Sequence, residues 1–213
     1  MSAATMTAPP KPAPAAAGPN PYRWTIHGYR KLGETGLFRD VKTMLLDGEL
    51  YVMPLPNPPH DLALGLADDY LRTAFSTGHH VRNQMGFDIG TTNDPGPDLA
   101  VVIGKRHDYA GRTPTAAVMV VEVAESSLFI DTTTKAELYA TAGVPDYWVI
   151  DLANRRLLVF RDPAPLPTGL GATAYRTHLT FGPGEGVAPL AAPGAAVNVA
   201  DLLPACPAAA GLS

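Results

Sequence analysis

Residues 118–127 read VMVVEVAESS, and this stretch predicts the strand around which the rest of the chain is arranged. Side chains alternate along a strand, so one face would carry Glu122 among apolar neighbours and the other would carry only Val and Met. Two apolar faces indicate a central strand that is covered on both sides. A carboxylate buried there costs several kcal/mol, or its pKa shifts upward, unless a cation compensates it.

Hydrophobic periodicity and turn residues predict the neighbouring elements. The Asp47-Gly48 pair between two apolar runs indicates a β-hairpin over 41–54. Asp131 is a candidate N-cap of the third helix, and Gly143 stands where that helix would stop. The expected helices cover 24–38, 56–78 and 131–143, and the expected strands fall in 79–90, 96–104, 115–124, 144–162 (two strands) and 174–181. This order predicts an α/β fold (α+β mixed), with a mixed central β-sheet flanked by helices.

The composition is that of one globular domain. The 213 residues are 46% hydrophobic and 17% charged, with a net charge of −4, which argues against an extensive phosphate-binding surface but permits a local basic groove. We expect a disordered Pro/Ala-rich tail over 1–21, a single domain over 22–204 and a flexible tail over 205–213.

The sequence indicates a cytoplasmic protein without a membrane partner. It shows no secretory signal pattern and no apolar run of the roughly 18 residues that a membrane helix needs. Cys206 is its single cysteine, so no disulfide can form within the chain.

Three charged residues are predicted to converge. Asp98 begins one buried strand and Glu122 ends the next, so antiparallel pairing would bring the two carboxylates together. Lys135 lies on the apolar stripe of the following helix and can reach back to them. Two neighbouring carboxylates repel each other, and Mg²⁺ or Mn²⁺ would remove that repulsion.

Simpler explanations exist for each residue taken alone. Asp98 can be a turn residue, Lys135 can lie at the edge of its stripe with its ammonium group in water, and Glu122 can form a structural ion pair with Lys135. Asp131 can cap the helix or hold Lys135 at i+4. The order Asp, then Glu on the next strand, then Lys on the next helix favours a shared site.

These motifs resemble a known family. PDLAVV (97–102), VMVVEVAESS (118–127) and DTTTKAELYATAGVPDYW (131–148) are similar to the Uma2 family, in the PD-(D/E)XK superfamily of restriction-endonuclease-like nucleases. The likeness extends over about residues 25–203 and implies the restriction-endonuclease-like form of the mixed sheet.

The resemblance also implies roles for individual residues. Asp98 and Glu122 would be metal ligands, joined by the backbone carbonyl of Val123 and by Glu49. In the superfamily pattern the catalytic lysine stands two residues after the acid of the central strand, and here that position holds Ala124. Uma2-like sequences have the lysine on the next helix instead, so the resemblance implies that Lys135 is the catalytic lysine. His60 resembles a histidine typical of the family and would face the site or the substrate, although it can also be a surface or capping residue. Ser126 follows the Glu122 strand, so by position it can contact the phosphate of a substrate or be an ordinary loop residue. The chain departs from the family at Met44, where members commonly have Glu.

The implied function is Mg²⁺- or Mn²⁺-dependent hydrolysis of phosphodiester bonds in DNA. Asp98 and Glu122 would hold the metal, and Lys135 would orient or deprotonate the attacking water or stabilise the transition-state charge. The sequence does not decide between DNA and RNA as the substrate. A homodimer is compatible with this function, because cutting both strands of a duplex needs two sites. One alternative is a weak or inactive nuclease-fold protein that binds nucleic acid or a protein partner. Another is a structural protein with a buried ion pair.

Overall fold

The computed structural model describes residues 20–166 and 173–205. Except for residues 20, 21 and 205, the predicted tails lie outside these ranges, as does Cys206. The helices are α1 (Ile26–Glu34), α2 (Pro58–Ala74), α3 (Leu128–Thr132) and α4 (Thr134–Thr141), with 3₁₀ turns at Arg106–Tyr109 and Val199–Leu202. The strands are β1 (Lys42–Leu46), β2 (Glu49–Met53), β3 (His79–Asn83), β4 (Leu99–Ile103), β5 (Met119–Ala124), β6 (Asp146–Asp151), β7 (Arg156–Pro165), β8 (Thr173–Phe181), β9 (Gly186–Val187) and β10 (Val197–Asn198).

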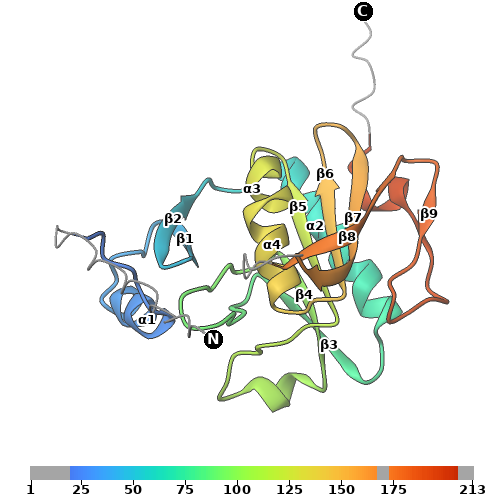
Figure 1. Cartoon of the computed structure of the whole chain (residues 1–213). Helices are drawn as coiled ribbons and strands as arrows, with labels where there is room; N and C mark the ends of the chain where they lie inside the picture. Colours follow the sequence, from blue (N-terminus) through green and yellow to red (C-terminus); the bar gives the residue numbers. More distant parts are fainter. Residues whose placement is uncertain (1–19, 167–172, 206–213) are drawn as a thin grey trace, which may run out of the picture.

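A mixed six-stranded sheet forms the centre of the molecule, in the order β3-β4-β5-β6-β7-β8 (Figure 1). Neighbouring strands are antiparallel except β5 and β6, which are parallel. A parallel pair needs a crossover connection, and α3 and α4 supply it. The predicted mixed central β-sheet flanked by helices is confirmed.

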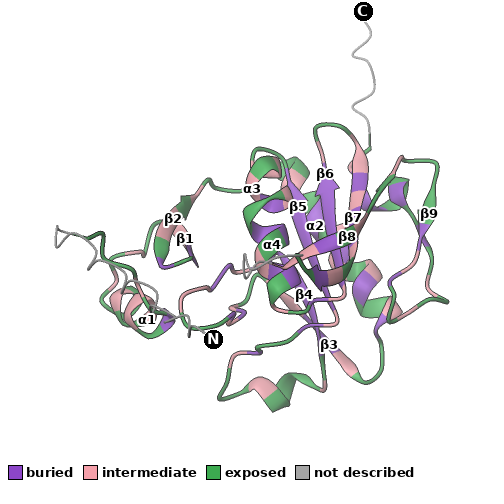
Figure 2. Cartoon of the chain, in the orientation of Figure 1, coloured by how far each residue is buried: buried purple, intermediate pink, exposed green. Residues whose placement is uncertain are grey.

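Helices cover both faces of this sheet, as the two apolar faces of β5 predict. On one face α2 packs against Val121, Val123 and Trp148. On the other α4 packs against Val120 and Val149. Every residue of β5 and β6 is buried, and Figure 2 shows the buried residues concentrated along the central strands. Glu122 therefore lies in the interior, on the α4 face.

The β1–β2 hairpin and α1 lie together beside the main sheet (Figure 1). The turn takes the predicted form, with positive φ at Asp47 (47°) and Gly48 (71°). A β-carbon on Gly48 would lie 2.9 Å from Cβ of Arg23, so glycine also permits a close approach there. Arg30 of α1 donates hydrogen bonds to Asp88 and Asp94, which ties this part to the loop before β4.

Two predicted elements differ from the structure. The third helix starts earlier and is broken at Thr133 (φ −118°, ψ −84°). Asp131 is therefore not its N-cap but a buried residue inside α3. The strand expected over 79–90 ends at Asn83, because Gln84 has a φ of 49° and its N–H bonds to the carbonyl of Asp98. Among the described residues, no helix has the length and apolar character to cross a bilayer.

Candidate active site

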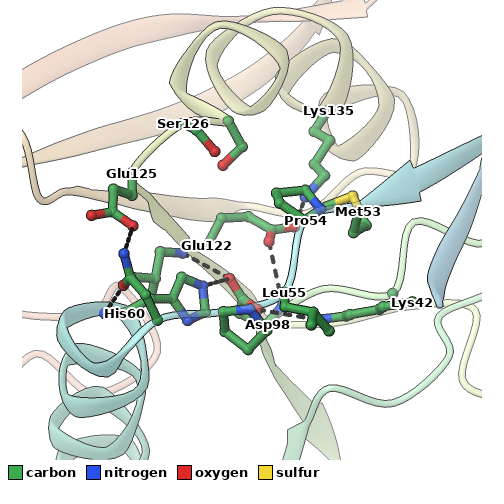
Figure 3. Close-up of a pocket in the computed structure, with 15 residues that line it drawn as sticks. Lys42, Met53, Pro54, Leu55, His60, Asp98, Glu122, Glu125, Ser126 and Lys135 are labelled. Atoms are coloured by element: carbon green, nitrogen blue, oxygen red, sulfur yellow. Dashed lines mark hydrogen bonds and ion pairs between the residues drawn. The ribbon is translucent and has the colours of Figure 1, made fainter. Parts of the chain in front are cut away.

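A pocket of about 260 Å³ opens where β4 begins and β5 ends (Figure 3). Its wall on one side is the connection from β2 to α2, residues 53–57. Ser126 and Ser127, which precede α3, line it on another side. Asp98, Glu122 and Lys135, the three residues predicted to converge, all line this pocket.

Strand register brings the two carboxylates together. Leu99 pairs with Val121 in the antiparallel β4–β5 ladder, so Asp98 stands opposite Glu122. The N–H of Asp98 lies 3.3 Å from Oε2 of Glu122, and the N–H of Val123 donates to Oδ2 of Asp98 at 3.0 Å. Both side chains are buried, with 6% of Asp98 and 2% of Glu122 exposed.

Lys135 is enclosed with these acids rather than lying at the edge of its helix. Only 2% of the residue is exposed. Its Nζ lies 3.1 Å from Oε1 of Glu122 and 2.9 Å from Oδ1 of Asp131. Asp131 also accepts a hydrogen bond from Ser127 Oγ, while its backbone carbonyl accepts one from Tyr147. The break between α3 and α4 thus places Asp131 where it can hold Lys135.

The two carboxylates have opposite pKa shifts. Burial by itself would raise the pKa of Asp98, but hydrogen bonds from His60 and from the Val123 N–H outweigh it and lower that pKa to about 2. Burial raises the pKa of Glu122 to about 8 in spite of Lys135, whose charge is shared with Asp131. Asp98 is therefore held ionised, while burial opposes the ionisation of Glu122.

The Lys135 ammonium group stays charged. Burial opposes its charge, but the Glu122 and Asp131 carboxylates outweigh that effect and raise the pKa of Lys135 above its ordinary value. A lysine held in this form donates hydrogen bonds and stabilises negative charge. It is poorly suited to accept a proton.

Three further side chains lie at the pocket. His60, at the start of α2, has Nε2 3.5 Å from Oδ2 of Asp98, so its imidazole lies at the pocket. Its hydrogen bond with Asp98 raises the pKa of His60. Ser126 lines the pocket too. Lys42, which the sequence did not single out, has Nζ 3.8 Å from Oδ1 of Asp98.

Glu49 does not join the cluster. Its carboxylate lies 2.7 Å from Nη1 of Arg23 and accepts a hydrogen bond from Tyr51, and it does not line the pocket. The expectation that Glu49 completes a metal site therefore disagrees with its position. Met44, the departure from the family pattern, is buried in β1 two residues after Lys42.

Several residues at the site had weak signals in the sequence. Tyr139 donates a hydrogen bond to Oε1 of Glu122 at 2.6 Å, and its i+4 spacing from Lys135 was the available signal. Asn57 caps α2 through the His60 N–H and also donates to Glu125 across the pocket. Nothing local marks Lys42, because its approach to Asp98 depends on how the hairpin docks.

The donor set fits a hard divalent cation bound together with a substrate. Within 20–166 and 173–205, no three His, Cys, Asp or Glu side chains form a self-sufficient metal cluster. Mg²⁺ usually keeps several waters and takes one or two protein carboxylates plus phosphate oxygens, so it needs no such cluster. Asp98 and Glu122 provide two buried hard oxygen donors at an open pocket.

Comparison with protein families decides the family. The model of Uma2, described as "Putative restriction endonuclease", matches residues 29–200. The chain belongs to the Uma2 family. The match spans the hairpin, the central sheet and the pocket, so all three convergent residues of this Uma2 chain lie inside it.

A solved structure has the same fold. It is a crystal structure from Anabaena variabilis, described as a putative nuclease belonging to DUF820. It is 17% identical to the Uma2 chain, with a TM-score of 0.65, and the match covers 84% of this chain and 97% of that one. This likeness confirms the nuclease-like fold. No curated protein matches the chain.

Proposed function

We propose that this chain is a metal-dependent endonuclease that hydrolyses phosphodiester bonds of DNA. Membership of a restriction-endonuclease family supports nuclease chemistry in general. The observation that carries the finer proposal is the convergence at one pocket of Asp98, just before β4, Glu122 of β5 and Lys135 of α4.

Asp98 and Glu122 would hold Mg²⁺ or Mn²⁺, with the backbone carbonyl of Val123 as a further donor. When bound, the cation would supply Lewis-acid polarisation of the phosphate and a bound water of lowered pKa. Asp98 suits this role because its low pKa keeps it ionised and ready to bind. A cation held there would favour the ionised form of Glu122, against the upward pKa shift that burial causes.

Lys135 would act as a fixed cation. Since it stays protonated, it would donate a hydrogen bond to the attacking water or to the phosphate and would stabilise the negative charge of the transition state. Lys42 and His60, on opposite sides of Asp98, would bind phosphate oxygens as further donors.

The proposal is tested by cleavage of supercoiled plasmid and of labelled single- and double-stranded DNA and RNA oligonucleotides, with Mg²⁺, Mn²⁺ or EDTA. We expect the wild type to cut DNA when metal is present and to be inactive in EDTA. Glu122→Gln and Lys135→Ala should lose at least about a hundredfold in rate while keeping the fold by circular dichroism. Glu49→Gln should cut like the wild type, because Glu49 lies outside the pocket.

Equal cleavage by the wild type, Glu122→Gln and Lys135→Ala would refute this assignment. Metal-dependent DNA binding without cleavage would instead indicate a nuclease-fold binding protein. The specific observation that favours this second candidate is the apolar Met44 on the strand that carries Lys42.

A further inference from the structure

Tyr139 is a buried hydroxyl group that the proposed reaction does not use. The residue is fully buried in α4, one turn after Lys135, so both side chains lie on the same helix face. The Tyr139 hydroxyl donates to Oε1 of Glu122 at 2.6 Å, and Nζ of Lys135 lies 3.1 Å from the same oxygen.

The two carboxylate oxygens of Glu122 therefore differ in their hydrogen-bond donors. Oε1 accepts from two donors and faces α4. Oε2 lies 3.3 Å from the Asp98 N–H, a longer contact, and it lies on the side of the neighbouring carboxylate (Figure 3). A carboxylate oxygen can accept more than one such bond, so Oε2 retains capacity for a ligand in the pocket.

Tyr139 is better suited than Lys135 to set this orientation. Its buried ring lies near two other aromatic rings, with centroid distances of 6.3 Å to Phe87 and 4.9 Å to Tyr147. A tyrosine has two side-chain torsions, and here packing restricts both. Lys135 has a flexible stem, and its ammonium group is shared with Asp131.

We propose that Tyr139 is a positioning residue for Glu122: it holds Oε1 so that Oε2 faces the cation bound beside Asp98. This inference rests on the proposed metal-dependent function. Partners that orient a metal ligand typically change affinity or activity by about 10- to 100-fold when they are removed.

The test compares Tyr139→Phe with Tyr175→Phe. Tyr175 is a matched control, because it is also a buried tyrosine of the α4-side core and its hydroxyl donates to the backbone carbonyl of Val144 at 2.8 Å. Each variant loses one buried hydroxyl and its hydrogen bond. We expect the Mn²⁺ Kd, measured by calorimetry without DNA, to rise at least about tenfold only in Tyr139→Phe. Its kcat should fall by a similar factor, with KM for DNA unchanged.

A second variant restores the donor. Tyr139→4-aminophenylalanine retains an N–H group at the same end of the ring and should return the Mn²⁺ Kd toward the wild-type value. If Tyr139→Phe fails to fold, the 4-aminophenylalanine variant replaces it in the test. A Mn²⁺ Kd equal to that of the wild type in this variant would then support the inference.

Three results would overturn it. If the wild type binds Mn²⁺ and cuts DNA but Tyr139→Phe has the same Mn²⁺ Kd, the positioning role is wrong and the proposed function stands. If Tyr175→Phe weakens Mn²⁺ binding equally, or 4-aminophenylalanine fails to restore it, the effect is general loosening of the core. If the wild type neither binds Mn²⁺ nor cuts DNA, the proposed function and this inference fall together.

Discussion

At the residue scale, the contacts of Glu122 explain how the most apolar strand of the chain can hold an acid. It is enclosed by one cation, one hydroxyl group and one backbone N–H, each at hydrogen-bonding or ion-pair distance. These contacts reduce the cost of burial, but the pKa of Glu122 is still raised to about 8. A metal-free protein therefore contains an acid that resists ionisation at neutral pH.

This predicts a pH-dependent stability with a defined sign. The folded-state pKa of Glu122 lies above the reference value of 4.5, so the folded protein binds the proton more tightly than the unfolded chain. The resulting stability is fully present below about pH 4.5 and is lost as the pH rises toward 8, by at most about 1.4 kcal/mol per pH unit. In EDTA, the wild type should lose unfolding free energy relative to Glu122→Gln between pH 5 and 8.

Urea titrations at each pH measure this difference. Groups common to both proteins, including His60, cancel in the comparison, and Asp98, with a pKa of about 2, titrates below this range. Saturating Mg²⁺ at pH 8 should stabilise the wild type more than Glu122→Gln, because only the wild type offers both carboxylate ligands, Asp98 and Glu122. Parallel stability curves in EDTA would show that Glu122 is already ionised throughout.

At the element scale, another buried acid, Asp146, links β6 to β7 and to the segment after β9. Asp146 is fully buried, and its Oδ1 accepts from Trp148 Nε1 at 2.9 Å and from Arg161 Nε at 2.8 Å. Its Oδ2 accepts from the N–H of Leu190 at 2.8 Å. Because β6 is the parallel partner of β5, this junction also supports the strand that carries Glu122.

Asp146→Ala should therefore destabilise the protein strongly. It would leave Arg161, mostly buried, without its carboxylate, and breaking such a pair costs about 3–5 kcal/mol. Asp68→Ala is the control, because it removes an Asp–Arg pair whose arginine, Arg72, is 41% exposed and stays hydrated, so the cost should be about 0–1 kcal/mol. Urea unfolding measures both changes, and equal losses would contradict the structural role of Asp146.

At the scale of the whole molecule, the site is assembled by parts that are distant in the chain. The hairpin contributes Lys42, the connection before β4 contributes Asp98, β5 contributes Glu122 and α4 contributes Lys135. Both buried apolar clusters lie within residues 63–203. The core and the pocket thus fall inside the single domain predicted over 22–204.

A chain trimmed to 22–204 should therefore keep its fold and activity. We expect its Tm to lie within about 4 °C of the full-length value, the shift that roughly 1 kcal/mol produces in a domain of this size. DNA cleavage with Mn²⁺ should be unchanged, with trimmed Glu122→Gln as the inactive reference. A larger fall in Tm, or loss of cleavage, would show that residues outside 22–204 belong to the functional unit.

The sequence by itself determined the features that depend on neighbouring residues. Alternation in 118–124 marked β5 as doubly covered, Asp47-Gly48 marked the hairpin, and helical spacing placed Lys135 on the buried face of its helix. The Uma2 resemblance, which rests on short motifs of neighbouring residues, was confirmed by the family match over 29–200. These features can be predicted from a single sequence, because backbone geometry sets the side-chain period of a strand or a helix.

Only the tertiary structure decided which side chains meet. The β4–β5 register set Asp98 against Glu122, while docking of the hairpin brought Lys42 rather than Glu49 to the pocket. The sequence left Asp131 open between a helix cap and a partner of Lys135. It is the second partner of Lys135, because a buried ammonium group needs a compensating charge and the carboxylate of Asp131 lies 2.9 Å away. The first two outcomes depend on contacts between distant segments, which local spacing does not encode.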